Sequence, residues 1–262
     1  MIDIHTHILP ACDDGSPDLE TSLTHIKMMK DAGVTGIVLT PHYMMGPYQN
    51  TAEIFEQRYN QLQKALQENS ISMQLYKAFE IYLESNSLEE IKNKDLSING
   101  TKYVLVETGF HGFPKDFTHI LYELVINGFY PILAHPERYP DISNNPDLAE
   151  DLIHRNIYLQ LNAASFIGLY GKKIQQTAWN LLKNGHCHFI ASDNHCNFEE
   201  YIVPQVLDKI EKTIDKYTVE LLTEINPEKM LRNEKIDFFY VENVQSNETI
   251  FIQKFKNLFK RK

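Results

Sequence analysis

The chain begins Met1-Ile-Asp-Ile-His-Thr-His7, and this stretch decides how the rest of the sequence is interpreted. Residues 2–4 form a short apolar run that suits a buried strand, and His5 and His7 follow it directly. Side chains alternate between the two faces of a strand, so histidines separated by one residue point to the same side. Imidazole is the commonest protein ligand for metals. The opening residues therefore predict a metal site at the end of a strand.

Six further apolar runs are rich in β-branched or aromatic residues, and they lie at 36–39, 74–79, 103–106, 130–134, 158–161 and 188–191. Amphipathic segments separate them, at 17–31, 52–69, 116–127, 146–155, 172–184 and 204–216. For the first of these helices, Ser16 is the expected N-cap and Pro17 the expected first residue. Regular alternation of strands and helices predicts a parallel sheet with helical crossovers.

Side chains that can bind metals follow six of the seven predicted strands. They are His5 and His7 after the first, His42 after the second, Glu80 after the third, Glu107 after the fourth, His135 after the fifth, and Asp193 and His195 after the seventh. A lone histidine at a strand end is usually structural, but this many ligand-type residues at equivalent places predict one shared site. Asp13 and Asp14, in the loop after the first strand, are further candidates.

The placement of these residues also favours one architecture over another. An open doubly wound sheet fits the alternation, but it would spread the side chains along an edge. A barrel gathers all strand C-termini on one face, where its active sites lie. We therefore predict an α/β fold, a distorted TIM-like (β/α)7 barrel with the active site at the C-terminal ends of the strands. This domain is expected to span residues 1–243, with a basic amphipathic tail at 244–262.

The types of ligand restrict the metal and its chemistry. Imidazole and carboxylate without thiolate suit Mn²⁺, Fe²⁺ or Zn²⁺. Glu80 and Glu107 are expected to bridge neighbouring ions, and ions ~3.5–4 Å apart form a clamp for phosphoryl displacement. Arg138 lies three residues after His135, and its planar fork suits phosphate. The alternative for this arginine is a surface ion pair with a neighbouring acid, Glu137 or Asp141.

Composition and cysteines exclude several other classes of protein. The net charge of −10 disfavours binding to nucleic acid. A cysteine phosphatase needs an arginine six residues after its nucleophile, and none of Cys12, Cys187 and Cys196 has one. Three cysteines, no recognisable signal peptide and no run of ~20 apolar residues indicate a cytoplasmic protein with reduced thiols.

Taken together, the motifs resemble those of the PHP (polymerase and histidinol phosphatase) superfamily. The matching segments are Asp3-Ile-His5-Thr-His7, Thr40-Pro-His42, Glu80, Glu107, His135-Pro136 and Ser192-Asp193-Asn194-His195. Within the superfamily, the chain is most similar to bacterial tyrosine phosphatases associated with capsule and exopolysaccharide synthesis. Leu9-Pro10, Asp13-Asp14-Gly15 and His135-Pro-Glu-Arg138 carry that closer likeness.

The resemblance implies a metal-dependent protein-tyrosine phosphatase that hydrolyses phosphotyrosine with a metal-activated hydroxide. It implies up to three ions, usually Mn²⁺, and as substrate the tyrosine-rich tail of a membrane-bound tyrosine kinase that controls polysaccharide export. Carried over, His5, His7, Glu80 and Asp193 hold one ion; Glu80, Glu107 and His135 hold a second; Asp14, or its rival Asp13, holds a third with His42 and His195. Relatives often carry a second arginine after the last motif, but residues 196–201 read Cys-Asn-Phe-Glu-Glu-Tyr.

Two other functions and one additional contact remain open from the sequence. The same chemistry suits a small phosphomonoester such as histidinol phosphate, and a PHP-like module can bind metal for regulation without catalysis. Residues 250–262 combine aromatic and basic side chains, which suits weak contact with an anionic membrane surface or with the kinase. The alternative for this segment is a solvated terminus.

Overall fold

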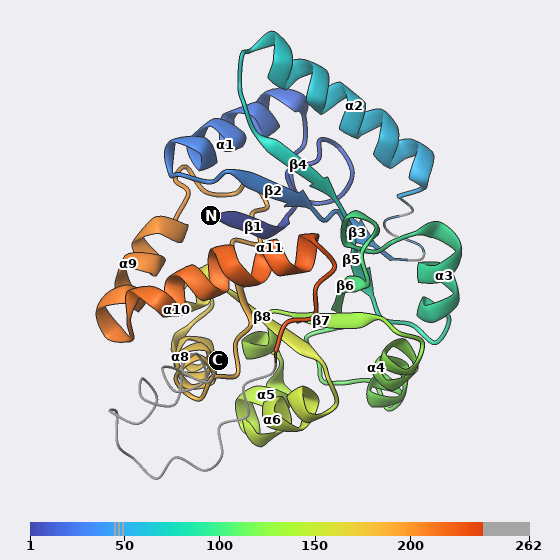
Figure 1. The fold of residues 1–262 in the computed structure, drawn as a ribbon, viewed down its shortest axis with the longest axis vertical. Helices are drawn as coiled ribbons and strands as arrows, with labels where there is room; N and C mark the ends of the chain where they lie inside the picture. Colours follow the sequence, from blue (N-terminus) through green and yellow to red (C-terminus); the bar gives the residue numbers. More distant parts are fainter. Residues whose placement is uncertain (45, 47, 49, 238–262) are drawn as a thin grey trace, which may run out of the picture.

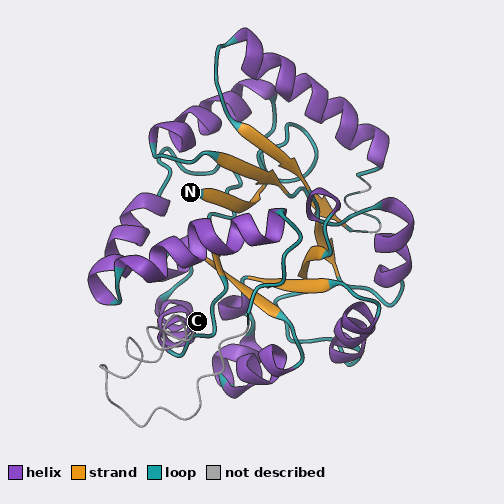
Figure 2. Cartoon of the chain, in the orientation of Figure 1, coloured by secondary structure: helices purple, strands orange, loops and turns teal. Residues whose placement is uncertain are grey.

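A computed structural model describes residues 1–44, 46, 48 and 50–237. Parallel strands occupy the middle of the molecule and helices surround them (Figures 1 and 2). The strands are β1 (Ile2–Thr6), β2 (Gly36–Leu39), β3 (His42–Tyr43), β4 (Gln74–Lys77), β5 (Glu80–Tyr82), β6 (Tyr103–Glu107), β7 (Tyr130–Ala134), β8 (Tyr158–Asn162) and β9 (Phe189–Ala191). All their ladder pairings are parallel, so the α/β fold predicted from the alternation is confirmed.

The strands form two sheets with the orders β1-β2-β4 and β3-β5-β6-β7-β8-β9. Residues 40–41 separate β2 from β3, and residues 78–79 separate β4 from β5. The second sheet therefore continues the first. The predicted strand at 74–79 is therefore wrong in its extent: it ends at Lys77, and Glu80 begins β5 instead of following a strand.

The free edges of the two sheets also meet. The backbone N–H of His7 donates to the carbonyl of Asn194 at 3.0 Å, and the N–H of Asp193 donates to the carbonyl of His5 at 3.0 Å. A parallel bridge pairs Thr6 with Asn194. These contacts bring the segment after β9 against the end of β1, so residues from both ends of the domain face one centre. This agrees with the expected TIM-like arrangement.

The helices begin and end close to the predicted limits, and several short ones were not predicted. They are α1 (Leu19–Asp31), α2 (Ala52–Glu68), α3 (Ser87–Lys94), η1 (Ile98–Gly100), α4 (Phe117–Ile126), η2 (Pro136–Arg138), α5 (Pro140–Asn144), α6 (Asp147–His154), α7 (Ala163–Phe166), α8 (Lys172–Lys183), α9 (Val203–Thr213), α10 (Lys216–Glu220), η3 (Leu221–Ile225) and α11 (Asn226–Leu231). Among residues 1–237, gaps aside, no helix has the length and hydropathy needed to cross a bilayer. The predicted tail at 244–262 lies outside the described residues.

The first helix starts later than expected, and its cap is a different residue. Asp18 is the N-cap, and its carboxylate accepts a hydrogen bond from the backbone N–H of Thr21 at 2.8 Å. Ser16 instead donates to the carbonyl of Asp18 and lies 2.8 Å from the hydroxyl of Ser22. A carboxylate caps the positive end of a helix as well as a hydroxyl does, so both residues fit the sequence and tertiary contacts decide between them.

Two apolar layers support the strands. The larger one lies between the strands and the outer helices, and a smaller one fills the space that the strands surround. Within the smaller cluster, the hydroxyls of Tyr103 and Tyr158 donate to the carbonyls of Glu234 and Ile236. The segment after α11 therefore covers the amino ends of the strands, on the side that faces the viewer in Figure 1. The carboxyl ends open on the opposite side.

Candidate metal centre

His5 and His7 lie side by side, as their spacing predicts, and both side chains are fully buried. Their Nε2 atoms are 3.1 Å apart. Oδ1 of Asp193 lies 3.3 Å from each of these nitrogens, and Oε2 of Glu80 also lies 3.3 Å from each. Four side chains from β1, β5 and the loop after β9 thus direct their ligand atoms to one point.

Glu80 faces a second group of ligands with its other oxygen. Its Oε1 lies 3.0 Å from Nε2 of His135, and Oε2 of Glu107 lies 3.8 Å from the same nitrogen. The remaining oxygen of Glu107 is 2.9 Å from Nδ1 of His42. Oε2 of Glu80 also lies 3.0 Å from that nitrogen of His42, so the carboxylate of Glu80 lies between two neighbouring groups.

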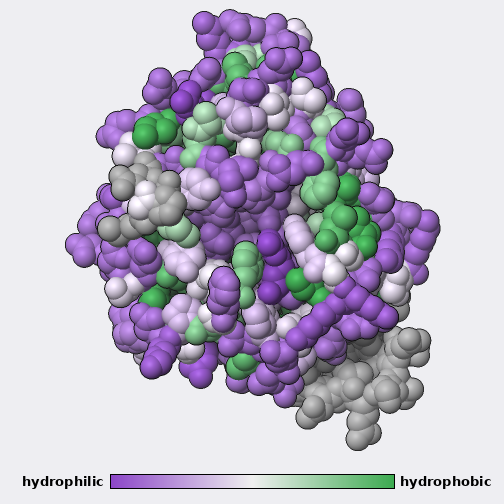
Figure 3. Space-filling view, turned by 180° about the vertical axis from the view of Figure 1, so that it is seen from behind, coloured by the Kyte–Doolittle hydropathy of each residue, from purple (hydrophilic) through white to green (hydrophobic). Residues whose placement is uncertain are grey.

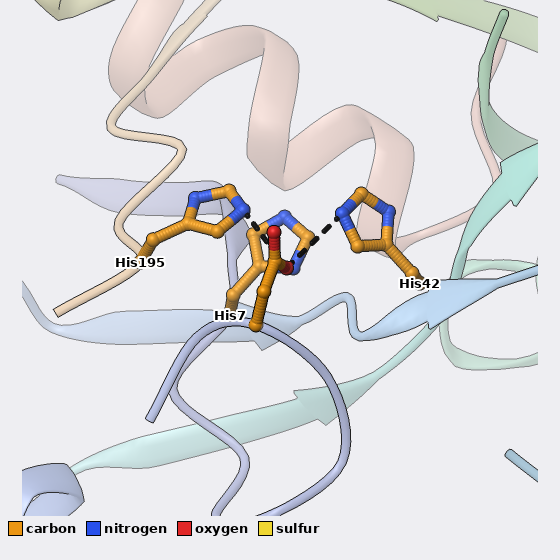
Figure 4. Close-up of side chains that lie close together, drawn as sticks. His7, His42 and His195 are labelled. Carbon is orange, nitrogen blue, oxygen red and sulfur yellow. Dashed lines mark ion pairs between the residues drawn. The ribbon is translucent and has the colours of Figure 1, made fainter. Parts of the chain in front are cut away.

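A third group forms around Asp14. Figure 4 shows His7, His42 and His195 arranged around one carboxylate. Oδ1 of Asp14 lies 3.4 Å from Nε2 of His42 and 3.5 Å from Nε2 of His195. One ligand atom from each of these four residues lies within 4.8 Å of the others. The centre thus divides into three overlapping groups.

Asp13, the rival to Asp14, has a different place. Its Oδ2 accepts hydrogen bonds from Nδ1 of His7 at 2.7 Å and from the backbone N–H of His42 at 2.9 Å. Its other oxygen accepts from the backbone N–H of Gly15 at 2.9 Å. With Nδ1 of His7 protonated toward Asp13, Nε2 keeps its lone pair for a metal. Asp13 therefore orients a ligand, while Asp14 lies among the ligands.

Gln160 and Asn162, which were not predicted from the sequence, also contact the candidate ligands. Gln160 Oε1 lies 2.8 Å from Nδ1 of His5, and Gln160 Nε2 donates to Oδ1 of Asn162 at 2.8 Å. Asn162 Nδ2 in turn donates to Oδ2 of Asp193 at 2.6 Å. Both amides come from β8, the one predicted strand without a ligand at its end. The available signal was the alternation of Gln160 and Asn162 on one face of an otherwise apolar strand.

The backbone turns sharply at two of the ligands. His135 has a φ of 39° and Asp193 a φ of 52°, both in the left-handed region. Residues other than glycine seldom adopt it, and such positions cost about 1–3 kcal/mol. Histidine and aspartate tolerate the region better than most residues do. His135 comes directly after β7 and Asp193 two residues after the end of β9, and both side chains face the centre.

The residues present fit a cluster of divalent cations. Among the described residues, buried side-chain atoms without a hydrogen-bond partner include Oε2 of Glu80, Oδ1 of Asp193 and Nδ1 of His42. Leaving such atoms unpaired is costly, and all three face the other ligands. A divalent cation would satisfy them together, and the imidazole and carboxylate donors suit Mn²⁺, Fe²⁺ or Zn²⁺.

The ligands also perturb one another electrostatically. Burial alone would raise the pKa of Glu80, but the charge of His5 and hydrogen bonds with His135 hold this pKa well below its ordinary value. Burial alone would lower the pKa of His42, but the nearby carboxylates of Glu107 and Glu80 raise it to about 10. The hydrogen bond with His195 lowers the pKa of Asp14 to about 2. The carboxylates of Glu80 and Asp14 therefore stay ionised at neutral pH.

Arg138 borders the centre and does not pair with the acids next to it in the sequence. Its Nη1 donates to Oδ2 of Asp193 at 3.3 Å. Glu137 is buried and accepts hydrogen bonds from Asn162 and Ser165 instead. The surface ion pair considered as an alternative is thus not formed within the described structure. Figure 3, which shows the side opposite to Figure 1, has hydrophilic residues gathered at the middle of this face.

Comparison with known proteins identifies the family. The family described as capsular polysaccharide synthesis, CpsB/CapC, matches residues 1–232. The chain belongs to the CpsB/CapC family. The expected likeness to capsule-associated bacterial phosphatases is thereby confirmed, and the matched range includes every candidate ligand and Arg138.

Two bacterial proteins resemble this chain over most of their length. Tyrosine-protein phosphatase YwqE of Bacillus subtilis is 33% identical over 238 residues, which cover 90% of this chain and 93% of the relative. The putative tyrosine-protein phosphatase CapC of Staphylococcus aureus is 32% identical over 239 residues, with the same coverage of 90% and 93%.

Solved structures support the same assignment. A chain from the crystal structures of YwqE from B. subtilis and CpsB from Streptococcus pneumoniae, described as unique metal-dependent tyrosine phosphatases, matches with a TM-score of 0.87 and 31% identity. The match covers 94% of this chain and 100% of the other. Histidinol phosphate phosphatase from Lactococcus lactis matches with a TM-score of 0.54 at 16% identity, which shows a shared fold alone.

Proposed function

We propose that this CpsB/CapC protein is a metal-dependent protein-tyrosine phosphatase, that is, a phosphoric monoester hydrolase acting on phosphotyrosine. One observation carries the proposal: buried carboxylates and imidazoles from separate strands converge on one centre and leave ligand atoms unpaired. The names of the relatives YwqE and CapC supply the substrate class. A nucleophilic cysteine has no part in this proposed mechanism.

We propose three overlapping metal sites, built from the groups described above. His5, His7, Glu80 and Asp193 would hold one cation; Glu80, Glu107 and His135 a second; Asp14, His42 and His195 a third. The short distances within each group support this division. Mn²⁺ is our preferred ion, with Fe²⁺ or Zn²⁺ compatible with the same donors. When bound, the cations supply Lewis acidity that activates water and neutralises phosphoryl charge.

The protein's own side chains have separate tasks in this proposal. Arg138 borders the centre beside Asp193, and its guanidinium would bind the phosphoryl oxygens as negative charge develops. Asp13 and Gln160 hold the imidazoles of His7 and His5 in the tautomer that leaves Nε2 free. The leaving group is a phenolate with a pKa of ~10, so a strong general acid is not required.

We further propose the tail of a membrane-bound tyrosine kinase as the substrate, with the phosphatase acting in the cytoplasm. The description of the family as capsular polysaccharide synthesis proteins supports this context. The net charge of −10 disfavours nucleic acid as an alternative partner. Contact of residues 244–262 with a membrane surface stays a prediction, because those residues lie outside the described structure.

One experiment tests the function directly. Protein purified without chelator is analysed for metals and assayed with a phosphotyrosyl peptide and with histidinol phosphate. We expect bound divalent metal and a strong preference for the peptide. The Glu80→Ala/His135→Ala variant should lose metal and activity together. Faster turnover of histidinol phosphate would reassign the substrate, and full activity without metal would refute the mechanism.

A further inference from the structure

The guanidinium of Arg138 lies between two aromatic rings. Its Cζ atom is 4.2 Å from the centroid of the Phe110 ring and 4.4 Å from the centroid of the Tyr170 ring. Both distances are well inside the range of a cation–π contact. Phe110 comes from the loop after β6, and Tyr170 comes from the loop between α7 and α8. Two separate segments thus converge on one side chain.

These rings border the metal centre, and Phe110 also stacks on the buried ring of Tyr139, with 5.7 Å between the ring centroids. Phe110 is 39% exposed, which is unusual for so large an apolar side chain. Its ring centroid lies 5.2 Å from that of His135, one of the proposed ligands. Tyr170 is half-buried. Phe110 thus joins a core residue, Tyr139, to Arg138 at the edge of the polar centre.

The geometry leaves the hydrogen-bonding edge of Arg138 available. A guanidinium is planar: its faces stack on rings, while its N–H donors point outward in the plane. Within the described part of the chain, Asp193 is its hydrogen-bond acceptor, through Nη1 alone. Ordering a free arginine costs up to ~2 kcal/mol of rotamer entropy. Rings that fix the plane in advance reduce that cost when an anion binds.

We propose that Phe110 and Tyr170 are positioning residues that clamp Arg138 and orient its donors toward a phosphoryl group at the metal centre. The proposal rests on the proposed function, because it takes the ligand to be a phosphoryl group. It extends that function by assigning two aromatic residues that act through the arginine. It also accounts for how a single arginine can serve here, where residues 196–201 contain none.

A double-mutant cycle on phosphate binding tests the clamp. Metal-loaded protein is titrated calorimetrically with inorganic phosphate, and Phe110→Leu and Tyr170→Leu are compared in the native and Arg138→Ala backgrounds. In the native background, each substitution should raise Kd by about threefold to thirtyfold, the range of one desolvated cation–π contact. In the Arg138→Ala background, the same substitutions should change Kd by less than about twofold.

Two further variants separate positioning from general damage. Tyr170→Phe keeps the ring and should keep the phosphate affinity, whereas Tyr170→Leu should not. Phe113→Leu is the matched control, because Phe113 stacks on Phe117 at 4.0 Å, whereas the described rings that contact Arg138 are those of Phe110 and Tyr170. Metal content and melting temperature are measured for every variant. Phe113→Leu should leave Kd for phosphate unchanged.

The outcomes distinguish this inference from the function on which it rests. Equal losses in both backgrounds, no loss in the native background, or phosphate binding that does not depend on Arg138 would each overturn the clamp. A native protein that binds phosphate with the expected coupling but does not hydrolyse a phosphotyrosyl peptide would refute the proposed function and leave the clamp standing.

Discussion

At the residue scale, Gln160 lies within hydrogen-bond distance of His5, one of the proposed metal ligands. We predict that Gln160→Leu lowers the affinity for divalent metal by about tenfold to a hundredfold, the usual effect of losing such an orienting partner. The substitution leaves Nδ1 of His5 without its acceptor at 2.8 Å. Metal titration of the variant measures the change, with the exposed Gln176→Leu as control. Unchanged affinity would show that the hydrogen bond does not orient His5.

His42 gives a prediction about pH. Its pKa in metal-free protein is raised to about 10, above the ordinary ~6.5. The stabilisation from its charge is therefore complete below about pH 6.5 and is lost as pH rises through 10. A cation must displace this proton, so binding at pH 8 should release it and affinity should rise with pH. Calorimetry in two buffers of different ionisation enthalpy counts the protons; His42→Asn should release fewer.

The convergence of the candidate ligand side chains could be predicted because their types and positions both carry information. His5 and Asp193 are residues of metal chemistry at the ends of apolar runs. Gln160 and Asn162 were missed because a neutral amide in an apolar strand has no such distinctive chemistry. The choice between Asp13 and Asp14 depends on the direction of each side chain in one loop, which spacing does not determine.

At the scale of elements, buried Glu137 connects η2 to the junction of β8 and α7. Its Oε1 accepts from the backbone N–H of Asn162 at 2.9 Å and from the hydroxyl of Ser165 at 2.6 Å. We predict that Glu137→Ala lowers the free energy of unfolding by about 2–4 kcal/mol, because two buried donors lose their acceptor. Urea denaturation measures this. Glu137→Gln keeps an acceptor and should lose clearly less; equal losses would contradict the explanation.

Elements whose structure is determined by a local sequence pattern could be predicted, and elements determined by tertiary contacts could not. The long helices have amphipathic periods, so α2 and α8 match their predicted limits to within one residue. The strand predicted at 74–79 ends at Lys77 because β4 pairs with β2, whereas the chain continues as β5, which begins at Glu80 and pairs with β3. The segment from α10 to α11 was not predicted. It packs against the amino ends of strands that are distant in the sequence, and local sequence patterns do not reveal such contacts.

At the scale of the whole molecule, the metal centre should contribute strongly to stability. When the cations are removed, the charges of the buried carboxylates are compensated by the imidazoles alone. A ligand at a thousand times its Kd stabilises the folded state by ~4 kcal/mol, so we expect chelation to lower the melting temperature by roughly 10 °C. Calorimetry with chelator and with Mn²⁺ measures the shift. The Glu80→Ala/His135→Ala variant should show almost none; an equal shift would point to binding elsewhere.

The contacts between β1 and the segment after β9 have a consequence for how the protein is made. The earliest ligands, at residues 5 and 7, and the latest, at 193 and 195, meet across the hydrogen bonds of this seam. During synthesis, residues 5 and 7 emerge from the ribosome long before residues 193 and 195. A nascent chain that ends before Asp193 cannot assemble the centre, so truncated products of this kind should remain inert toward phosphate esters.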